Sequence, residues 1–197
     1  MLDQLLSAFA NTPWTEWVAF FTSIIYVWLA SRKSSWCWPF AIISSGIYIL
    51  LCFQSKLYAD SALQSFYVLM AVWAWGNWGK EGSSIKLIVQ WPYQKHLINI
   101  AICLLVTLLI GFILDTYTDQ ALPYTDAFIF CFSLSATYLI GKKVLENWIY
   151  FIIIDLIAIP LFWNRELYVT SLLYLCYTII ALDAWRKWRK DFQTTRL

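Results

Sequence analysis

The stretches KLYADSALQSFY (Lys56–Tyr67) and ELYVTSLLYLCY (Glu166–Tyr177) follow one pattern. A shift of 110 residues along the chain superposes the two stretches, and we call it the repeat shift. The same shift superposes Pro13–Trp78 on Pro123–Trp188 without a gap. In that superposition 21 of the 66 aligned pairs are identical. Shared apolar composition does not readily align Pro, Tyr and Trp residues at one offset, so the match indicates a true repeat. The sequence therefore predicts two copies of one unit, at residues 13–78 and 123–188.

The overall composition sets the class of protein. Hydrophobic residues make up 61% of the 197 residues and charged residues 13%, against about 45–50% apolar and about 25% charged residues in soluble domains. The net charge of +2 gives no electrostatic basis for binding nucleic acid. A polytopic membrane protein is therefore expected. The five cysteines lack the spacing of a metal site or a disulfide framework, so no metal or cofactor is expected.

Seven segments are long and apolar enough to cross a bilayer as helices of about 20 residues. They are Trp14–Ala30, Trp36–Phe53, Leu57–Trp78, Leu97–Leu114, Tyr124–Ile140, Leu145–Trp163 and Leu167–Trp185. Each copy of the repeat holds three segments, and residues 97–114 stand alone between the copies as a linker helix. Because three is odd, this linker restores the chain direction and makes the two units parallel. The prediction is one all-α transmembrane domain over residues 1–197, arranged 3+1+3 as in SWEET transporters.

Basic residues predict the orientation of this domain. Twelve Lys and Arg residues fall on one side of the predicted membrane, and only Lys56 and Arg165 fall on the other. Because cytoplasmic loops carry the excess of positive charge, the N-terminus is expected outside and the C-terminus in the cytoplasm. An even number of spans would destroy this segregation, so the charge pattern also favours seven.

A stripe of aromatic and amide residues runs along the third predicted span at helical spacing. It contains Gln64, Tyr67, Ala71, Trp75 and Trp78, which the repeat shift matches with Tyr174, Tyr177, Ala181, Trp185 and Trp188 in the seventh span. Two such stripes meeting across a pseudo-twofold axis would line a central cavity, with Gln64 and Tyr174 making its two sides different. The alternative is that the stripes only pack the helices together, aided by the small alanines.

Asp155 lies near the middle of the sixth predicted span. An ionised carboxylate at that depth costs at least about 2.5–3.5 kcal/mol, so it needs a partner, a wet cavity or a proton. We expect Asp155 to bind substrate hydroxyls or a cation; a hydrogen-bonded structural carboxylic acid is the alternative. Asp183, near the end of the seventh span, is expected to snorkel to the membrane surface or to pair with the basic tail, and His96, in a basic loop, is not expected to be a proton relay.

Two regions of the sequence resemble the signatures of the PnuC family of nicotinamide riboside transporters. They are LYADSALQSFYVLMAVWAWGNW (Leu57–Trp78), and ENWIYFIIIDLIAIPLF (Glu146–Phe162) with the LYVTSLLYLCY run that follows it. The resemblance implies an importer of a vitamin B3 precursor in the bacterial inner membrane, working by facilitated diffusion, with a cytoplasmic kinase that traps the substrate. It also implies a homotrimer. Its motif positions imply a binding and gating role for Gln64, Tyr67, Trp75, Asn77, Trp78, Asn147, Trp148, Asp155 and Tyr174.

The chemistry of nicotinamide riboside fits these residue types. Aromatic faces attract a pyridinium cation by about 0.5–2 kcal/mol, Gln64 offers a donor and an acceptor to the carboxamide, and Asp155 can accept from ribose hydroxyls. A phosphorylated substrate would need cationic partners, which the middle of the predicted bundle lacks. A sugar or another nucleoside is the alternative substrate, and proton coupling through Asp155 stays open. Because the sequence contains no HExxH, GxSxG or P-loop motif, an enzyme is not expected.

Overall fold

The computed structural model describes residue 10 and residues 12–54, 58–79, 88–118 and 122–195. This part of the chain is all-helical, as the sequence predicts, and contains seven long helices. They are α2 (Trp14–Ser31), α3 (Cys37–Gln54), α4 (Tyr58–Gly79), α5 (Tyr93–Tyr117), α6 (Pro123–Gly141), α7 (Asn147–Asn164) and α8 (Tyr168–Thr195). Each of them coincides with one predicted segment, and most bounds differ by only a few residues.

Four of the described helices are by themselves long and apolar enough to cross a membrane. They are Tyr93–Tyr117, Pro123–Gly141, Asn147–Asn164 and Tyr168–Thr194. The described helix Cys37–Leu51 within α3 is also apolar but is shorter, and α4 carries the polar residues Gln64 and Asn77. Polar residues are tolerated within a membrane when they face neighbouring helices rather than lipid, and α2, α3 and α4 pack against one another and against the apolar helices.

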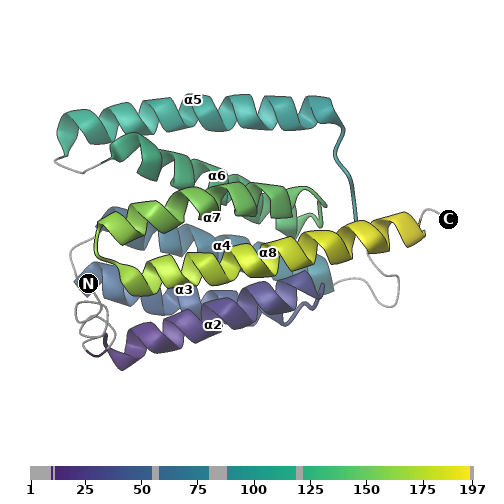
Figure 1. The fold of residues 1–197 in the computed structure, drawn as a ribbon, viewed down its shortest axis with the longest axis horizontal. Coiled ribbons are helices and arrows are strands. Elements are labelled where there is room, and N and C mark those ends of the chain that lie inside the picture. The colour runs from purple at the N-terminus through teal and green to yellow at the C-terminus, as the bar shows by residue number, and fades with distance from the viewer. Residues whose placement is uncertain (1–9, 11, 55–57, 80–87, 119–121, 196–197) are drawn as a thin grey trace.

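The helices form two groups of three, with α5 to one side (Figure 1). Within the groups, α3 packs against α2 and α4, and α7 packs against α6 and α8. Between the groups, α2 packs against α8 and α4 packs against α6. Under the repeat shift α2 corresponds to α6 and α4 to α8, so these two contacts are equivalent. The helix α5 packs mainly against α6, and its residues His96 and Asn99 also contact Tyr150 on α7.

The turns after α2 and α6 have the same backbone structure. Lys33 and Lys143, which the repeat shift superposes, both adopt the left-handed conformation, with φ of 59° and 55°. Backbone hydrogen bonds close the two turns alike, from Ser34 N to Leu29 O at 3.1 Å and from Val144 N to Leu139 O at 3.0 Å. Each turn is thus a Schellman motif that uses lysine where glycine is usual.

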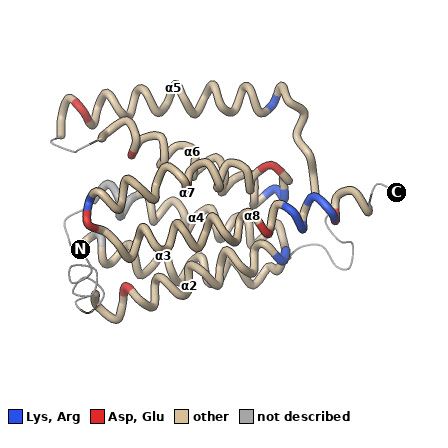
Figure 2. The backbone as a smooth tube through the Cα atoms, viewed as in Figure 1, with Lys and Arg blue, Asp and Glu red and all other residues tan. Residues whose placement is uncertain are grey.

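The charged side chains divide the bundle into two different ends. The helices α2, α4, α6 and α8 all run toward one end, where most of the described Lys and Arg residues gather (Figure 2). We call this the basic end. At the opposite end Arg165 is the one described basic residue, and its guanidinium binds the carboxylate of Asp126 through two hydrogen bonds of 2.9 and 2.5 Å.

Candidate functional site

Two tryptophans tie the helix groups together near the basic end. Trp78 Nε1 on α4 donates to the Gly141 carbonyl at the end of α6, at 2.9 Å. Trp188 Nε1 on α8 donates to the Ser31 carbonyl at the end of α2, at 2.8 Å. The repeat shift superposes the two donors and also the two acceptors, so the two bonds are equivalent. Each occupies a carbonyl that the end of a helix leaves without an intrahelical partner.

Two further tryptophans pack edge-on against this pair. The ring centroids of Trp38 and Trp78 lie 5.2 Å apart at 85°, and those of Trp148 and Trp188 lie 5.5 Å apart at 82°. Trp38 and Trp148 are again matched by the repeat shift, and both are almost completely buried. Their Nε1 atoms have no hydrogen-bond acceptor within the described residues. Two equivalent buried donors are therefore free to meet a ligand or water.

Tyrosine hydroxyls join the groups deeper in the bundle. Tyr67 on α4 forms a hydrogen bond with Ser133 on α6, and Tyr177 on α8 forms one with Ser23 on α2. The repeat shift relates these bonds as well. Tyr174, the partner of Gln64 in the repeat, stacks on Phe162 with ring centroids 5.2 Å apart at 9°. Tyrosine hydroxyls thus join the two groups, and the stack of Tyr174 on Phe162 joins α8 to α7 within one group.

Asp155 on α7 lies close enough to Tyr174 and Tyr177 to act on them electrostatically. The residue is 2% exposed, and its Oδ2 atom has no hydrogen-bond partner among the described residues. The corresponding residue in the first half of the chain is Ser45, also buried. An unsatisfied buried carboxylate on one side only makes this region chemically asymmetric, and it is costly unless a ligand, water or proton satisfies it.

Asn147 lies where α7 begins and is completely buried. Its Nδ2 atom donates to the Val144 carbonyl at 2.5 Å, so the side chain stabilises the turn before α7. Its Oδ1 atom is without a partner in the described part of the chain. The next residue is Trp148, so an unsatisfied acceptor and an unsatisfied donor follow one another at the start of this helix.

The other predicted site residues are more dispersed. Gln64 is half-buried on α4. Asn77 donates to the Trp73 carbonyl of its own helix at 3.0 Å, and Trp75 is 44% exposed, away from the tyrosines. Asp183 pairs with Lys187 on the same helix, which confirms its predicted pairing with the basic tail.

Two residues that the motifs did not single out also take part in the polar structure of the bundle. Trp38 has the same environment as Trp148, and the repeat shift was the signal that could have identified it. His96 on α5 has its Nδ1 atom 3.0 Å from the Tyr150 hydroxyl and its Nε2 atom 3.5 Å from Glu146. This histidine therefore joins α5 to the start of α7.

Comparison with known proteins assigns the chain to one family. Residues 13–190 match the family described as "Nicotinamide mononucleotide transporter". The nicotinamide riboside transporter PnuC of Escherichia coli (strain K12) is 26% identical over 205 residues, covering 90% of this chain and 86% of the relative. The riboflavin/roseoflavin transporter RibM of Streptomyces davaonensis is 22% identical over 182 residues, covering 89% of this chain and 84% of the relative.

A solved structure has the same fold. The crystal structure of the vitamin B3 transporter PnuC superposes with a TM-score of 0.73 at 22% sequence identity, covering 95% of this chain and 87% of that chain. At this identity the likeness shows the fold alone.

Proposed function

Because the chain belongs to the nicotinamide mononucleotide transporter family, we propose that it carries nicotinamide riboside across the bacterial inner membrane. The chain is a multi-pass membrane transporter and not an enzyme. The observation that carries the substrate proposal is the buried, unsatisfied carboxylate of Asp155 beside Tyr174 and Tyr177. A cation with hydroxyl donors supplies what this carboxylate lacks.

The relatives are named for three kinds of substrate, which are nicotinamide riboside, its mononucleotide and riboflavin. These substrates differ in charge. Nicotinamide riboside is cationic, its mononucleotide adds a phosphate, and riboflavin is larger and has no pyridinium. The described Lys and Arg residues lie at the two ends of the bundle (Figure 2), whereas Asp155 lies midway along α7, and a phosphate needs cationic partners. The unphosphorylated cation is therefore favoured, with a sugar or another nucleoside as the alternative.

Each proposed site residue has a role that its chemistry suits. Asp155 accepts from the ribose hydroxyls or offsets the pyridinium charge, and Gln64 pairs with the carboxamide. Tyr67 and Tyr174 form the aromatic walls. Asn77, Trp78, Asn147 and Trp148 act toward the basic end, where the substrate leaves, and Trp75 borders this region. We add Trp38 because its free Nε1 donor duplicates that of Trp148.

The proposed architecture is a SWEET-like 3+1+3 arrangement within a single transmembrane domain spanning residues 1–197. Residues 13–78 and 123–188 are the two parallel repeats, and residues 97–114 form the linker helix. Two pairs of hydrogen bonds support this arrangement, those of Trp78 and Trp188 and those of Tyr67 and Tyr177. In each pair the repeat shift matches both the donor and the acceptor residues. Binding at the midplane between the repeats is the usual position in such transporters.

We also propose an orientation in the membrane, an oligomeric state and a driving force for transport. The gathering of Lys and Arg at the basic end supports an N-terminus outside and a C-terminus in the cytoplasm. The helix α5 keeps most of its apolar side chains exposed, as suits a helix in contact with the lipid bilayer, and the family resemblance implies a homotrimer. Transport is by facilitated diffusion, and a cytoplasmic kinase that adds a phosphate traps the product. No cofactor is required, and proton coupling through Asp155 is the alternative energy source.

Calorimetric titration of the purified protein tests the substrate. Nicotinamide riboside should bind, and its mononucleotide and riboflavin should bind at least about tenfold more weakly, because charged hydrogen-bond partners are missing or mismatched. Asp155→Asn should weaken riboside binding by a similar factor, whereas Asp183→Asn, which removes an exposed pair, should leave it unchanged. Tighter binding of the mononucleotide or riboflavin, or sensitivity to Asp183→Asn alone, would contradict the proposal.

Uptake into liposomes tests the energetics. With no pH gradient and no nucleotide present, the riboside should equilibrate across the membrane, because facilitated diffusion needs only a substrate gradient. Accumulation above equilibrium when a proton gradient is imposed would instead favour the coupled alternative.

A further inference from the structure

A cavity lies beside α8 at the basic end, apart from the tyrosines and Asp155. Its volume is about 420 Å³, and it is lined by Gln90, Leu145, Trp185, Arg189, Phe192 and Gln193. The four lining residues of α8 are spaced so that they share one face of the helix. Leu145 comes from the turn before α7, and Gln90 comes from the segment before α5. Three parts of the chain thus border one half-open space, in which Gln90, Arg189 and Gln193 are exposed.

The walls of this cavity are held together by backbone hydrogen bonds. Val89 N donates to the Lys143 carbonyl at 3.0 Å, and Leu145 N donates to the Val89 carbonyl at 2.8 Å. These bonds join the segment before α5 to the turn before α7. On the α8 side, the Trp188 bond to Ser31 fixes the helix against α2. The backbone that carries the lining side chains is therefore held in place on both sides of the cavity.

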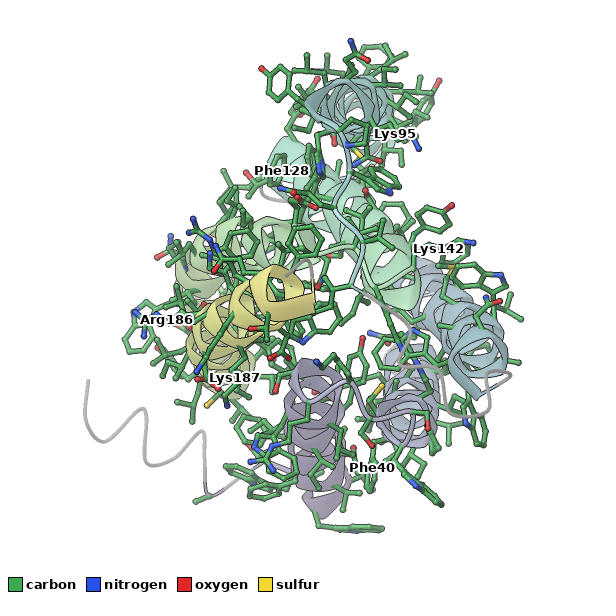
Figure 3. The ribbon with its side chains drawn as sticks, turned by 90° about the vertical axis from the view of Figure 1, so that its right-hand side faces the viewer. Phe40, Lys95, Phe128, Lys142, Arg186 and Lys187 are labelled. Carbon is green, nitrogen blue, oxygen red and sulfur yellow. The ribbon has the colours of Figure 1, made fainter. Side chains whose placement is uncertain are left out.

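Arg189 brings to the cavity a positive charge that no described carboxylate pairs with. On the same helix, Lys187 pairs with Asp183, and Asp191 pairs with Lys33. Arg189 has no ion-pair partner within the described residues. Figure 3 looks onto this end and shows Arg186 and Lys187 on the outer side of α8. A guanidinium in this setting suits a phosphate oxygen, to which it can donate two parallel hydrogen bonds.

The position of the cavity favours a phospholipid headgroup as its phosphate ligand. Trp185 is the residue at which the apolar part of α8 gives way to the basic run Arg186–Lys190, so it marks the border between membrane and water. Trp185, Phe192 and Leu145 present apolar surface to glycerol and the first acyl carbons. Gln90 and Gln193 each offer a donor and an acceptor to headgroup hydroxyls. One arginine matches the single negative charge of a phosphodiester.

We propose that this cavity binds the headgroup of an anionic phospholipid, with the phosphodiester on Arg189 and the headgroup hydroxyls on Gln90 and Gln193. Basic pockets beside transmembrane helices on the cytoplasmic side commonly receive such headgroups. The bound lipid braces α8, which carries Trp188, against the segment that leads into α5. The proposal rests on membrane insertion and on this cavity, and not on the identity of the transported substrate.

Native mass spectrometry of the purified full-length protein tests the proposal. With added phosphatidylglycerol the protein should retain one lipid, and with phosphatidylcholine it should retain none specifically. Arg189→Gln should weaken phosphatidylglycerol binding by about tenfold or more, since a charged hydrogen-bond partner is lost. The matched control is Lys190→Gln, which removes the adjacent charge of α8 but does not line the cavity and should change little. Gln193→Leu provides a second, charge-conserving variant that should also weaken binding.

Several outcomes would overturn the lipid site. Equal losses in the Arg189 and Lys190 variants would mean diffuse attraction to the basic run. Binding of glycerol 3-phosphate or inorganic phosphate that competes with the lipid at similar concentration would assign the cavity to a free phosphate compound. Absence of retained phosphatidylglycerol in the wild-type protein would remove the proposal entirely. Riboside titration of Arg189→Gln should match the wild type, so failure of the transport proposal is seen separately.

Discussion

The ring of Tyr124 on α6 packs directly against Gly111 on α5. A β-carbon at Gly111 would lie 2.4 Å from the Tyr124 Cδ1 atom and 3.0 Å from Cγ. Since α6 is the helix against which α5 packs most closely, this contact belongs to the main interface that attaches α5 to the bundle. The absence of a side chain at position 111 is therefore what allows the two helices to approach.

Replacing this glycine should loosen α5. Gly111→Ala should destabilise the folded protein by about 1–3 kcal/mol, the usual cost of forcing extra atoms into a packed contact. Thermal unfolding in detergent measures the effect. Gly46→Ala is the matched control, because a β-carbon at Gly46 would meet nothing within 4 Å. Equal melting temperatures for the two variants would show that Tyr124 moves aside freely.

The two tryptophan bonds should contribute equally to the joining of the helix groups. Trp78→Phe and Trp188→Phe each remove a donor and leave a buried helix-end carbonyl unpaired, which costs about 1–3 kcal/mol. Chemical unfolding in detergent compares the variants. The control is Trp75→Phe, on the same helix as Trp78 but 44% exposed, and it should have little effect. A large difference between Trp78→Phe and Trp188→Phe would contradict the equivalence of the two bonds.

The tyrosine–serine bonds can be measured as a coupling energy. In a double-mutant cycle, Tyr67→Phe and Ser133→Ala should be non-additive by at least about 0.5 kcal/mol, because each removes one partner of the same bond. Tyr67→Phe combined with Ser23→Ala should be additive, since Ser23 bonds to Tyr177 instead. Non-additivity in the second cycle, or its absence in the first, would contradict the pairing. The readout is the free energy of unfolding of each variant.

Arg165 and Asp126 should matter more than their exposed counterpart at the basic end. Arg165→Gln removes a bidentate partner from a largely buried carboxylate and should destabilise the protein by about 1–2 kcal/mol after allowance for solvent screening. Lys187→Gln breaks an exposed pair, with side chains 51% and 55% exposed, and should cost less than about 1 kcal/mol. Thermal unfolding at low and high salt compares the two variants. Equal effects would show that the Arg165 pair is fully screened.

The sequence predicted helix number and position well because long apolar runs separated by short polar turns leave few alternatives. The predicted and observed helix bounds differ where a helix continues beyond its apolar residues. The seventh segment was predicted to end at Trp185, yet α8 continues to Thr195, because lysine and arginine are good helix formers. Similarly, α5 begins at Tyr93 rather than Leu97, directly after Pro92 at its N-cap.

The candidate site was predictable only in part. Helical periodicity placed Tyr67 and Tyr174 on the two matching stripes. The cost of a charge within a membrane span marked Asp155 as unusual. Neither could identify which polar atoms lack partners, because that depends on neighbours from other helices. Trp38 was missed for this reason, although its match to Trp148 under the repeat shift was present in the sequence. Trp75 belongs to the predicted stripe but is 44% exposed. Residues eight apart on a helix do not point in the same direction, so Trp75 is turned away from Tyr67 toward the outside of the bundle.

The paired bonds of Trp78 and Trp188 have a consequence for how such a chain can be divided. Residue 78 reaches residue 141, and residue 188 reaches residue 31, so each half offers the same donor and receives at the same acceptor. This reciprocity is the signature of an isologous interface, in which one surface patch is complementary to itself. In symmetry terms the two halves meet as the subunits of a C2 dimer would, which agrees with the parallel repeats proposed above. Each half therefore carries a donor and an acceptor for the seam, so we expect separately expressed halves to associate through these two bonds.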